Sequence, residues 1–268
     1  MKPKTFLQVR EFGKENQKVL CLIHPTLVRW DYFDYVIPLL EKHFHLIIPS
    51  LPGYDLENDS EFCSVECVAV SLASYLKRKG ICKLDFLYGC SMGGAIALRM
   101  LIDQRVRVGT LIMDGGILPY QMPRALTRLI LIKDFLTIAV GKLGGKKLLI
   151  RAFSSDDFDQ ASIDYLGESL EHVSFRTIWR SFDSCNNYRL PKGPLHPQSK
   201  IYYWCAERER KRRKRDIRCL AGFLPETRFL IIKGIDHGAF PLRKPEHFAR
   251  KLLCLSERED PKQGKRFD

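Results

Sequence analysis

The sequence predicts an α/β fold with a mostly parallel, doubly wound sheet and one helical insertion. Two observations support this prediction. Short apolar runs typical of buried strands alternate with helix-like segments in both halves of the 268-residue chain, which is the pattern of a parallel sheet with helices on both faces. Between residues 117 and 199, helical patterns run without a convincing buried strand. Because the alternation then resumes, this stretch reads as an insertion between two strands of one sheet.

The first part of the chain, residues 1–116, supplies most strands of the expected core. Its first four elements are an edge strand at Thr5–Glu11, a buried strand at Val19–Ile23, a helix with one proline at Trp30–Phe44 and a strand at His45–Pro49. The pair Pro52–Gly53 marks a tight turn, and Ser64 is a suitable N-cap for the next helix. A helix at Ala95–Leu101 then lies between strands at Leu84–Tyr88 and Val108–Met113.

The second part of the chain contains the insertion and the end of the core. Residues 117–199 form a helical cap, with helical patterns at Leu126–Val140 and Ile163–Trp179. Residues 200–268 return to the core, with strands at Lys200–Trp204 and Thr227–Ile232 and a last helix around His247–Leu255. The final ten or so residues are rich in charge and are expected to form a frayed tail.

Composition favours a single soluble domain in a reducing compartment. A hydrophobic content of 45% is enough for a full core. The longest apolar region, Leu126–Val140, contains three charged residues and is too short to span a membrane. The N-terminus has no apolar stretch of signal-peptide length. Nine cysteines, without Cys-x-x-Cys or Cys/His ligand spacing, indicate no structural zinc. We therefore expect a cytoplasmic protein without a bound metal.

The net charge of +13 raises the question of a nucleic-acid partner. Seven of the eight residues from Arg208 to Arg215 are Lys or Arg. Apolar residues recur at helical spacing directly afterwards, from Ile217 to Leu224, so the cations are expected to begin the solvent face of an amphipathic helix. A basic run without interleaved aromatic residues is poor evidence for nucleic-acid binding, and we do not expect such a partner.

A serine at a strand-to-helix turn is the most informative feature of the chain. Ser91 lies in Gly-Cys-Ser-Met-Gly-Gly, directly after an apolar strand and directly before a helix. This is the layout of a nucleophile elbow, in which a strained backbone presents the serine hydroxyl and small neighbours let the strand and helix pack closely. The pattern predicts a nucleophilic serine at the carboxyl edge of the sheet.

A serine nucleophile needs a base, and the base needs an orienting carboxylate. His237 lies in a glycine-containing loop after the last strand, at the sheet edge where ligands bind in open α/β sheets. Glu209 follows the preceding strand at a suitable distance and is the favoured carboxylate. Asp114, which ends the strand after the serine helix, is the alternative. The sequence leaves both open, since either geometry is possible.

With these residues in place, the chain resembles the α/β-hydrolase superfamily, whose nucleophile, acid and base follow one another in this order. Two further segments are similar to family loops: His24-Pro25-Thr26 stands where His-Gly-x is common, and residues 51–55 resemble Leu-Pro-Gly-His-Gly. The resemblance implies an oxyanion hole formed by the backbone N–H groups of Met92 and Thr26. Pro25 departs from the family pattern, because it has a fixed φ and no N–H. No subfamily is identified.

The resemblance implies a serine hydrolase that cleaves a small or medium carboxylic ester or thioester through an acyl-enzyme. It implies no organic cofactor and no metal. Carbon–carbon hydrolases and acyltransferases use the same triad and remain alternatives, as does a non-catalytic ligand-binding member of the fold. The cap is expected to close over the site. Its aromatic residues either line an apolar pocket or pack the cap onto the sheet: Phe135, Phe153, Tyr165, Phe175, Trp179 and Phe182.

Overall fold

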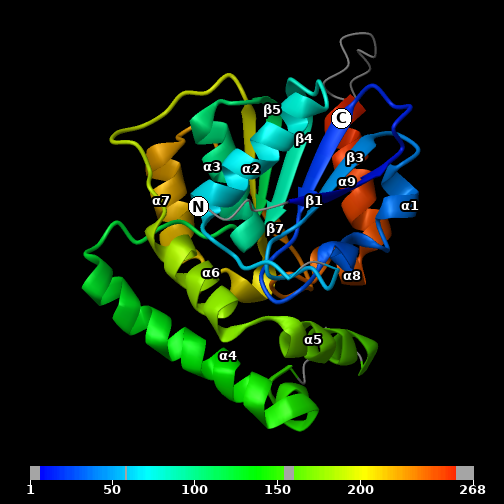
Figure 1. Cartoon of the computed structure of the whole chain (residues 1–268). Coiled ribbons are helices and arrows are strands. Elements are labelled where there is room, and N and C mark those ends of the chain that lie inside the picture. Colours follow the sequence, from blue (N-terminus) through cyan, green and yellow to red (C-terminus); the bar gives the residue numbers. More distant parts are fainter. Residues whose placement is uncertain (1–6, 58, 154–159, 258–268) are drawn as a thin grey trace.

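The computed structural model describes residues 7–57, 59–153 and 160–257, with side chains for all of these except 145–153 and 160–162 (Figure 1). The described residues form one seven-stranded sheet in the order β1-β3-β2-β4-β5-β6-β7, in which only β1 runs antiparallel to its neighbour. Its strands are β1 Gln8–Phe12, β2 Val19–Ile23, β3 His45–Ser50, β4 Lys83–Cys90, β5 Arg107–Asp114, β6 Lys200–Ala206 and β7 Arg228–Ile232. The predicted α/β fold is confirmed.

Two hydrophobic clusters, one on each face, show why the sheet is doubly wound. In β2, Cys21 and Ile23 belong to one cluster, while Leu20 and Leu22 belong to the other, because successive strand residues point to opposite faces. The first cluster packs under α2 (Val65–Arg78) and α3 (Met92–Asp103). The second packs under α9 (Pro245–Glu257). Both faces of the strands are therefore buried, which explains their nearly continuous apolar sequences.

The expected single helix at Trp30–Phe44 is wrong. The segment forms a 3₁₀ turn, η1 (Trp30–Phe33), and a separate short helix, α1 (Ile37–Leu40). Pro38 lies in the first turn of α1. Proline disfavours helical geometry at the residue before it and offers no N–H to a preceding turn, so a helix can begin there but cannot run through.

Three helices lie between β5 and β6, which pair directly with each other in parallel. These are α4 (Arg124–Phe153), α5 (Gln160–His172) and α6 (Phe175–Asn187), and Figure 1 shows them gathered at one end of the sheet. The pattern at Ile163–Trp179 spans two helices, because Ser174 caps α6 by accepting the N–H of Thr177 at 3.0 Å. No described helix is long and apolar enough to cross a membrane.

Two expectations concern the ends of the chain. The edge strand predicted at Thr5–Glu11 is present as β1, and its first residues, up to residue 6, lie outside the described residues. The charged tail also lies outside them, from residue 258 onward. The last core helices, α8 (Phe240–Arg243) and α9, follow the loop that carries His237 and close the second face of the sheet.

Candidate active site

Ser91 lies between β4 and α3 with a backbone conformation that L-residues rarely adopt. Its φ is 53° and its ψ is −114°. The turn is held by the N–H of Ser91, which donates to the carbonyl oxygen of Asp114 on the adjacent strand at 2.9 Å. Such strain persists only where surrounding contacts impose it, and it clusters at functional sites. The side chain is 4% exposed and lines a cavity.

The glycines around Ser91 are required by close backbone contacts. A Cβ at Gly89 would lie 2.2 Å from the carbonyl oxygen of Gly93, and one at Gly93 would lie 2.2 Å from that of Ile23. A Cβ at Gly94 would lie 2.7 Å from the Cα of Gly116. Any side chain would therefore push α3 away from β4 or from its neighbouring strands. The glycine pattern seen in the sequence is thus a packing requirement of the turn.

His237 and Glu209 meet at the same edge of the sheet. Nδ1 of His237 lies 2.7 Å from Oε2 of Glu209. Glu209, in the turn η2 (Glu207–Glu209) after β6, is only 1% exposed, and its Oε1 accepts the N–H of Ala206 at 3.3 Å. His237 follows β7 in the loop before α8. The carboxylate therefore reaches the ring nitrogen that faces away from a substrate in a serine triad.

The environment of Glu209 keeps its carboxylate ionised. Burial alone would raise its pKa, but the hydrogen bond from His237 and the charges of His237 and Arg213 outweigh burial and lower the pKa to about 2. A charged carboxylate at this position can hold the imidazole in one orientation and stabilise its protonated form.

Asp114, the alternative acid, is placed differently. It is buried, and its Oδ2 accepts a hydrogen bond from the hydroxyl of Tyr88 at 2.7 Å. Burial and the charge of Glu209 raise the pKa of Asp114 to about 7, against the lowering effect of Tyr88. The structure brings Glu209 to His237 and leaves Asp114 paired with Tyr88 beneath the serine turn.

Gly115 has no side chain and therefore leaves room for those of His237 and Glu209. Its φ is +55°, and an added Cβ would lie 2.7 Å from both Oε1 of Glu209 and Nδ1 of His237. We expect Gly115→Ala to lower kcat by about 100-fold or more, because a shift of about 1 Å in the candidate histidine–carboxylate pair has effects of that size. Gly222→Ala is the matched control, since nothing lies within 4 Å of a Cβ there. Equal kcat values for the two variants would contradict this role.

Arg213 is a residue of this site that the sequence reasoning missed. Its Nε donates to Oε2 of Glu209 at 2.8 Å, and its Nη2 lies 3.3 Å from Nε2 and 3.4 Å from Nδ1 of His237. Nη1 also pairs with Asp216 at 3.4 Å. Arg213 directly precedes α7, which begins at Lys214, and its side chain is only 17% exposed. The expectation that the whole basic run is solvated is therefore wrong for Arg213; only its position four residues after Glu209 signalled the pair.

Arg213→Gln is expected to destabilise the protein by about 3–5 kcal/mol, because it removes one partner of a buried ion pair. Glu209 and His237 keep each other, so kcat should fall less than after loss of the carboxylate. The free energy of unfolding in urea measures the first effect. Arg212→Gln is the control, since that side chain is 69% exposed and its loss should change stability by at most about 0.5 kcal/mol. Equal stability of the two variants would contradict the ion-pair account.

The backbone N–H groups expected to form an oxyanion hole belong to Met92, directly after Ser91, and to Thr26, in the loop after β2. Met92 is the first residue of α3, and the first N–H groups of a helix have no partner within the helix. Thr26 lines the cavity that contains Ser91. Leu27 next to it has a φ of 67°, so the loop after β2 is also strained.

His24 holds the loop after β2 in place through hydrogen bonds of its buried ring. Its Nδ1 lies 2.8 Å from the carbonyl oxygen of Pro25, and its Nε2 accepts the N–H of Leu51 at 3.3 Å. The ring is fully buried, and burial lowers its pKa to about 4. A neutral His24 thus joins the loop after β2 to the loop after β3, and it holds the Pro25–Thr26 segment in place.

This buried histidine predicts a pH dependence of stability. The unfolded chain protonates His24 near pH 6.5, whereas the folded state resists protonation until about pH 4. Stability from neutral His24 is therefore complete above about pH 6.5 and is lost as the pH falls toward 4. When the pH falls from 7 to 4.5, the free energy of unfolding should decrease by about 2 kcal/mol more in the wild type than in His24→Gln, as measured by urea unfolding. His43→Gln, at an exposed position, is the control; a wild type and His24→Gln with the same pH slope would refute the account.

Ser91 and His237 line a common cavity of about 470 Å³. Its wall includes apolar side chains from the loop after β2 and from α5, among them Leu27, Val28 and Leu166. Tyr165 of α5 also lines it, donates from its hydroxyl to Asp31, and accepts the N–H of Arg29 at 2.9 Å. Residues of α5 thus form part of the cavity wall, at a point where α5 is hydrogen-bonded to Arg29 and Asp31.

Six aromatic residues were singled out in the insertion, and among the five whose side chains are described, Tyr165 is the one that lines this cavity. Phe135 instead packs edge to face against Phe175 and Trp179, and Phe182 packs against the core. Phe153 lies outside the residues with described side chains. The packing role weighed for these aromatics therefore applies to most of them.

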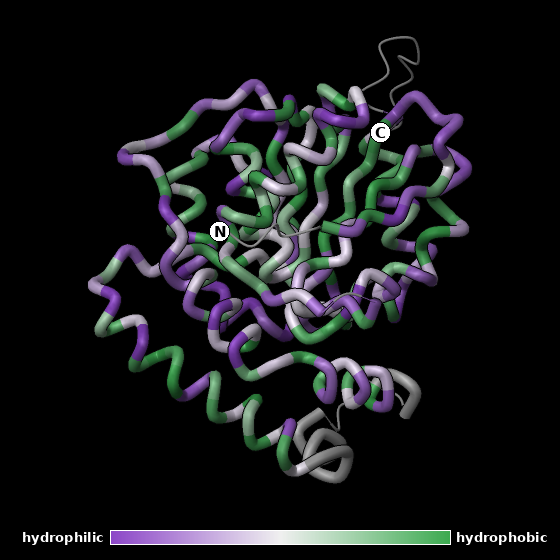
Figure 2. The backbone as a smooth tube through the Cα atoms, viewed as in Figure 1, coloured by the Kyte–Doolittle hydropathy of each residue, from purple (hydrophilic) through white to green (hydrophobic). Residues whose placement is uncertain are grey.

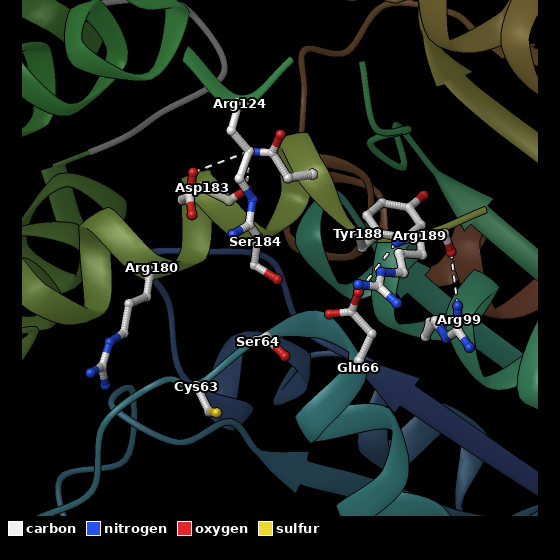
Figure 3. Close-up of a pocket in the computed structure, with 11 residues that line it drawn as sticks. Cys63, Ser64, Glu66, Arg99, Arg124, Arg180, Asp183, Ser184, Tyr188 and Arg189 are labelled. Carbon is white, nitrogen blue, oxygen red and sulfur yellow. Dashed lines mark hydrogen bonds between the residues drawn. The ribbon is translucent and has the colours of Figure 1, made fainter. Parts of the chain in front are cut away.

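A second cavity of about 510 Å³ has a different character (Figure 3). It lies between α2, α3 and α6 and is lined mainly by charged and polar side chains, including Arg99, Arg189, Glu66 and Asp183. Its potential nucleophiles are Cys63, Ser64 and Ser184, but none of the described residues that line it is a histidine. It therefore lacks the base that the cavity at Ser91 possesses.

The comparisons with known proteins agree with the fold. The family description "Alpha/beta hydrolase family" matches residues 22–251, so the chain belongs to the alpha/beta hydrolase family. By class it is therefore a hydrolase. The resemblance noted from the sequence is confirmed, and no particular subfamily emerges.

Solved structures from other organisms share this architecture. An alpha/beta hydrolase family protein from Desulfitobacterium hafniense is 18% identical, with a TM-score of 0.73, and the match covers 93% of this chain and all of that one. A structure from a study of carboxylesterases of Nitrososphaera gargenis is 21% identical, with a TM-score of 0.70 and coverage of 95% and 96%. MenH from S. aureus is 17% identical, with a TM-score of 0.70 and coverage of 95% and 99%. At these identities the likeness concerns the fold alone.

Proposed function

We propose that the protein is a serine hydrolase that cleaves a small or medium carboxylic ester or thioester. The observation that carries the proposal is the 2.7 Å contact between His237 and Glu209 at the cavity that also contains the strained Ser91. A hydroxyl, an imidazole and a buried carboxylate at one edge of a sheet are the parts needed for acyl transfer to water.

In the proposed mechanism His237 takes the hydroxyl proton of Ser91 as the serine oxygen attacks the substrate carbonyl. The developing oxyanion accepts hydrogen bonds from the N–H groups of Met92 and Thr26. Glu209 holds the imidazole and stabilises its positive charge. The imidazolium then gives its proton to the leaving alcohol or thiol, and an acyl-enzyme forms on Ser91. Water, deprotonated by His237, attacks this ester, releases the carboxylic acid and restores the hydroxyl.

Arg213 has a part in this scheme as a positioning residue. It binds the same carboxylate oxygen that faces His237, so it fixes Glu209 in the direction of the imidazole. Its guanidinium lies against the ring at 3.3–3.4 Å. The imidazole of His237 therefore lies between an anion and a cation, and Glu209 is the nearer of the two.

The insertion, with proposed limits at residues 117 and 199, acts as a cap over the site. Tyr165 and Leu166 of α5 lie in the wall of the cavity, and the apolar residues opposite them suit the acyl portion of a substrate.

We place the enzyme in the cytoplasm, since all nine cysteines, each within the described residues, are free and a reducing compartment keeps them so.

Carbon–carbon hydrolysis and acyl transfer to another acceptor use the same groups. A series of p-nitrophenyl esters from acetate to octanoate tests the proposed function. We expect release of p-nitrophenol together with one equivalent of carboxylic acid, and hydroxylamine should intercept the acyl-enzyme as a hydroxamate. Product that accumulates only with an added alcohol or thiol acceptor would favour an acyltransferase. No release of p-nitrophenol above that of Ser91→Ala, from a folded wild-type protein, would refute ester hydrolysis.

A further inference from the structure

The outer face of α4 is apolar and uncovered. Six of the twelve exposed large hydrophobic side chains among the described residues belong to this helix. They recur at intervals of three or four residues and so share one side of the helix: Leu126, Leu129, Ile132, Leu136, Val140 and Leu143. Leu129 is 66% exposed and Leu143 is 78% exposed. Apolar stretches of α4 are visible along the free edge of the molecule in Figure 2.

The inner face of α4 is also apolar, so the outer face is not needed to hold the insertion together. Leu131 and Ala139 are buried, and Phe135 packs against Phe175 and Trp179. A helix with apolar residues on two opposite faces normally buries both faces. A contiguous apolar face of this length on a soluble chain marks a surface that binds a partner.

The charge of α4 indicates which kind of partner suits its outer face. Among the residues of α4 whose side chains the structure describes, four are Lys or Arg and one is Asp, a net charge of +3, within a chain of net charge +13. Pairing this face with a second copy would bring two such helices together and oppose like charges. An anionic lipid surface presents acyl chains to the leucines and phosphates to the cations.

We propose that the outer face of α4 docks the protein on an anionic membrane surface. The leucines enter the boundary between headgroups and acyl chains, and the exposed Lys133 remains at the level of the phosphates. Arg128 is also exposed but lies 3.9 Å from Asp183 of α6. Docking is peripheral, since no described helix is long and apolar enough to cross a membrane. The helix packs on α5, whose Tyr165 lines the cavity at Ser91, so docking places the insertion between the lipid and the site.

Sedimentation with lipid vesicles tests this proposal independently of turnover. We expect the full chain and its Ser91→Ala variant to bind equally to vesicles of phosphatidylcholine and phosphatidylglycerol in equal amounts. Binding should be weaker to phosphatidylcholine alone and should fall as salt is raised. The double variant Leu129→Ser/Leu136→Ser should lower binding by at least about tenfold, because two side chains no longer leave water.

Leu56→Ser is the control, because Leu56 is an exposed leucine that does not belong to α4; it should leave vesicle binding unchanged. Thermal melting checks that all variants fold, which is expected because the replaced side chains are exposed. The proposal fails if the folded wild type does not bind the anionic vesicles, or if the double variant binds as well as the wild type. It also fails if sedimentation velocity shows that the wild type is a dimer and the double variant a monomer, since a second copy of the chain would then cover this face.

Discussion

Ser91→Ala is expected to lower kcat on an activated ester by about 10⁴–10⁶-fold, because the acyl-enzyme can no longer form. Residual catalysis would come from the oxyanion hole and from substrate binding alone. The substitution removes one oxygen from a turn whose shape is set by backbone contacts to Asp114 and by its glycines. The variant should therefore fold, with a melting temperature close to that of the wild type.

The measurement is turnover of p-nitrophenyl butyrate by wild type and variant under the same conditions. Ser74→Ala is a suitable control, since its hydroxyl lies on α2 and donates to the carbonyl oxygen of Val70 at 2.8 Å. It should leave kcat unchanged. If Ser91→Ala retained more than about a tenth of the wild-type kcat, another group would have to be the nucleophile.

Glu209→Gln is expected to lower kcat by about 10⁴-fold, because an amide neither holds the productive tautomer of His237 nor stabilises its charge. Asp114→Asn should lower kcat by less than about tenfold. Asp114 has a pKa raised to about 7 by burial, and an asparagine can still accept the hydrogen bond from Tyr88. Comparing the two variants thus tests which of the two carboxylates orients His237, a question that the sequence left open.

Both variants require the same measurements of kcat and melting temperature. The pair is nearly isosteric with the wild type, so a difference in kcat between folded proteins reports on the carboxylate itself. The opposite order, with Asp114→Asn the far weaker enzyme, would make Asp114 the orienting acid. If both variants lowered kcat only slightly and equally, neither carboxylate would be needed to orient His237.

Most of the sheet could be predicted because its signals are local. Strands buried on both faces are continuous apolar runs, and the serine turn requires its glycines within a few residues. The candidate site followed from topology, because the carboxyl ends of parallel strands meet at one edge. Ser91, Glu209 and His237 all follow strands, so their approach depended on strand order more than on side-chain detail.

The features that could not be predicted depend on distant contacts or on single breaks in a pattern. Arg213 appeared to be one of seven similar cations, and only the fold shows that it turns toward Glu209 and His237. The break at Pro38 was visible, but the apolar pattern around it continued across two separate elements. That His237 lies beside Glu209 and not beside Asp114 could not be predicted, because neither strand alone specifies the position of the histidine.

The most direct test of the account is covalent labelling with a fluorophosphonate, followed by intact mass measurement and peptide mapping. This reagent phosphonylates an activated serine hydroxyl and releases fluoride, so it reports on nucleophile and base together. The account predicts one adduct per wild-type chain, on the peptide that contains Ser91, and no adduct on Ser91→Ala. A folded wild-type protein that remains unlabelled, or an alanine variant that labels equally, would contradict the serine-hydrolase assignment.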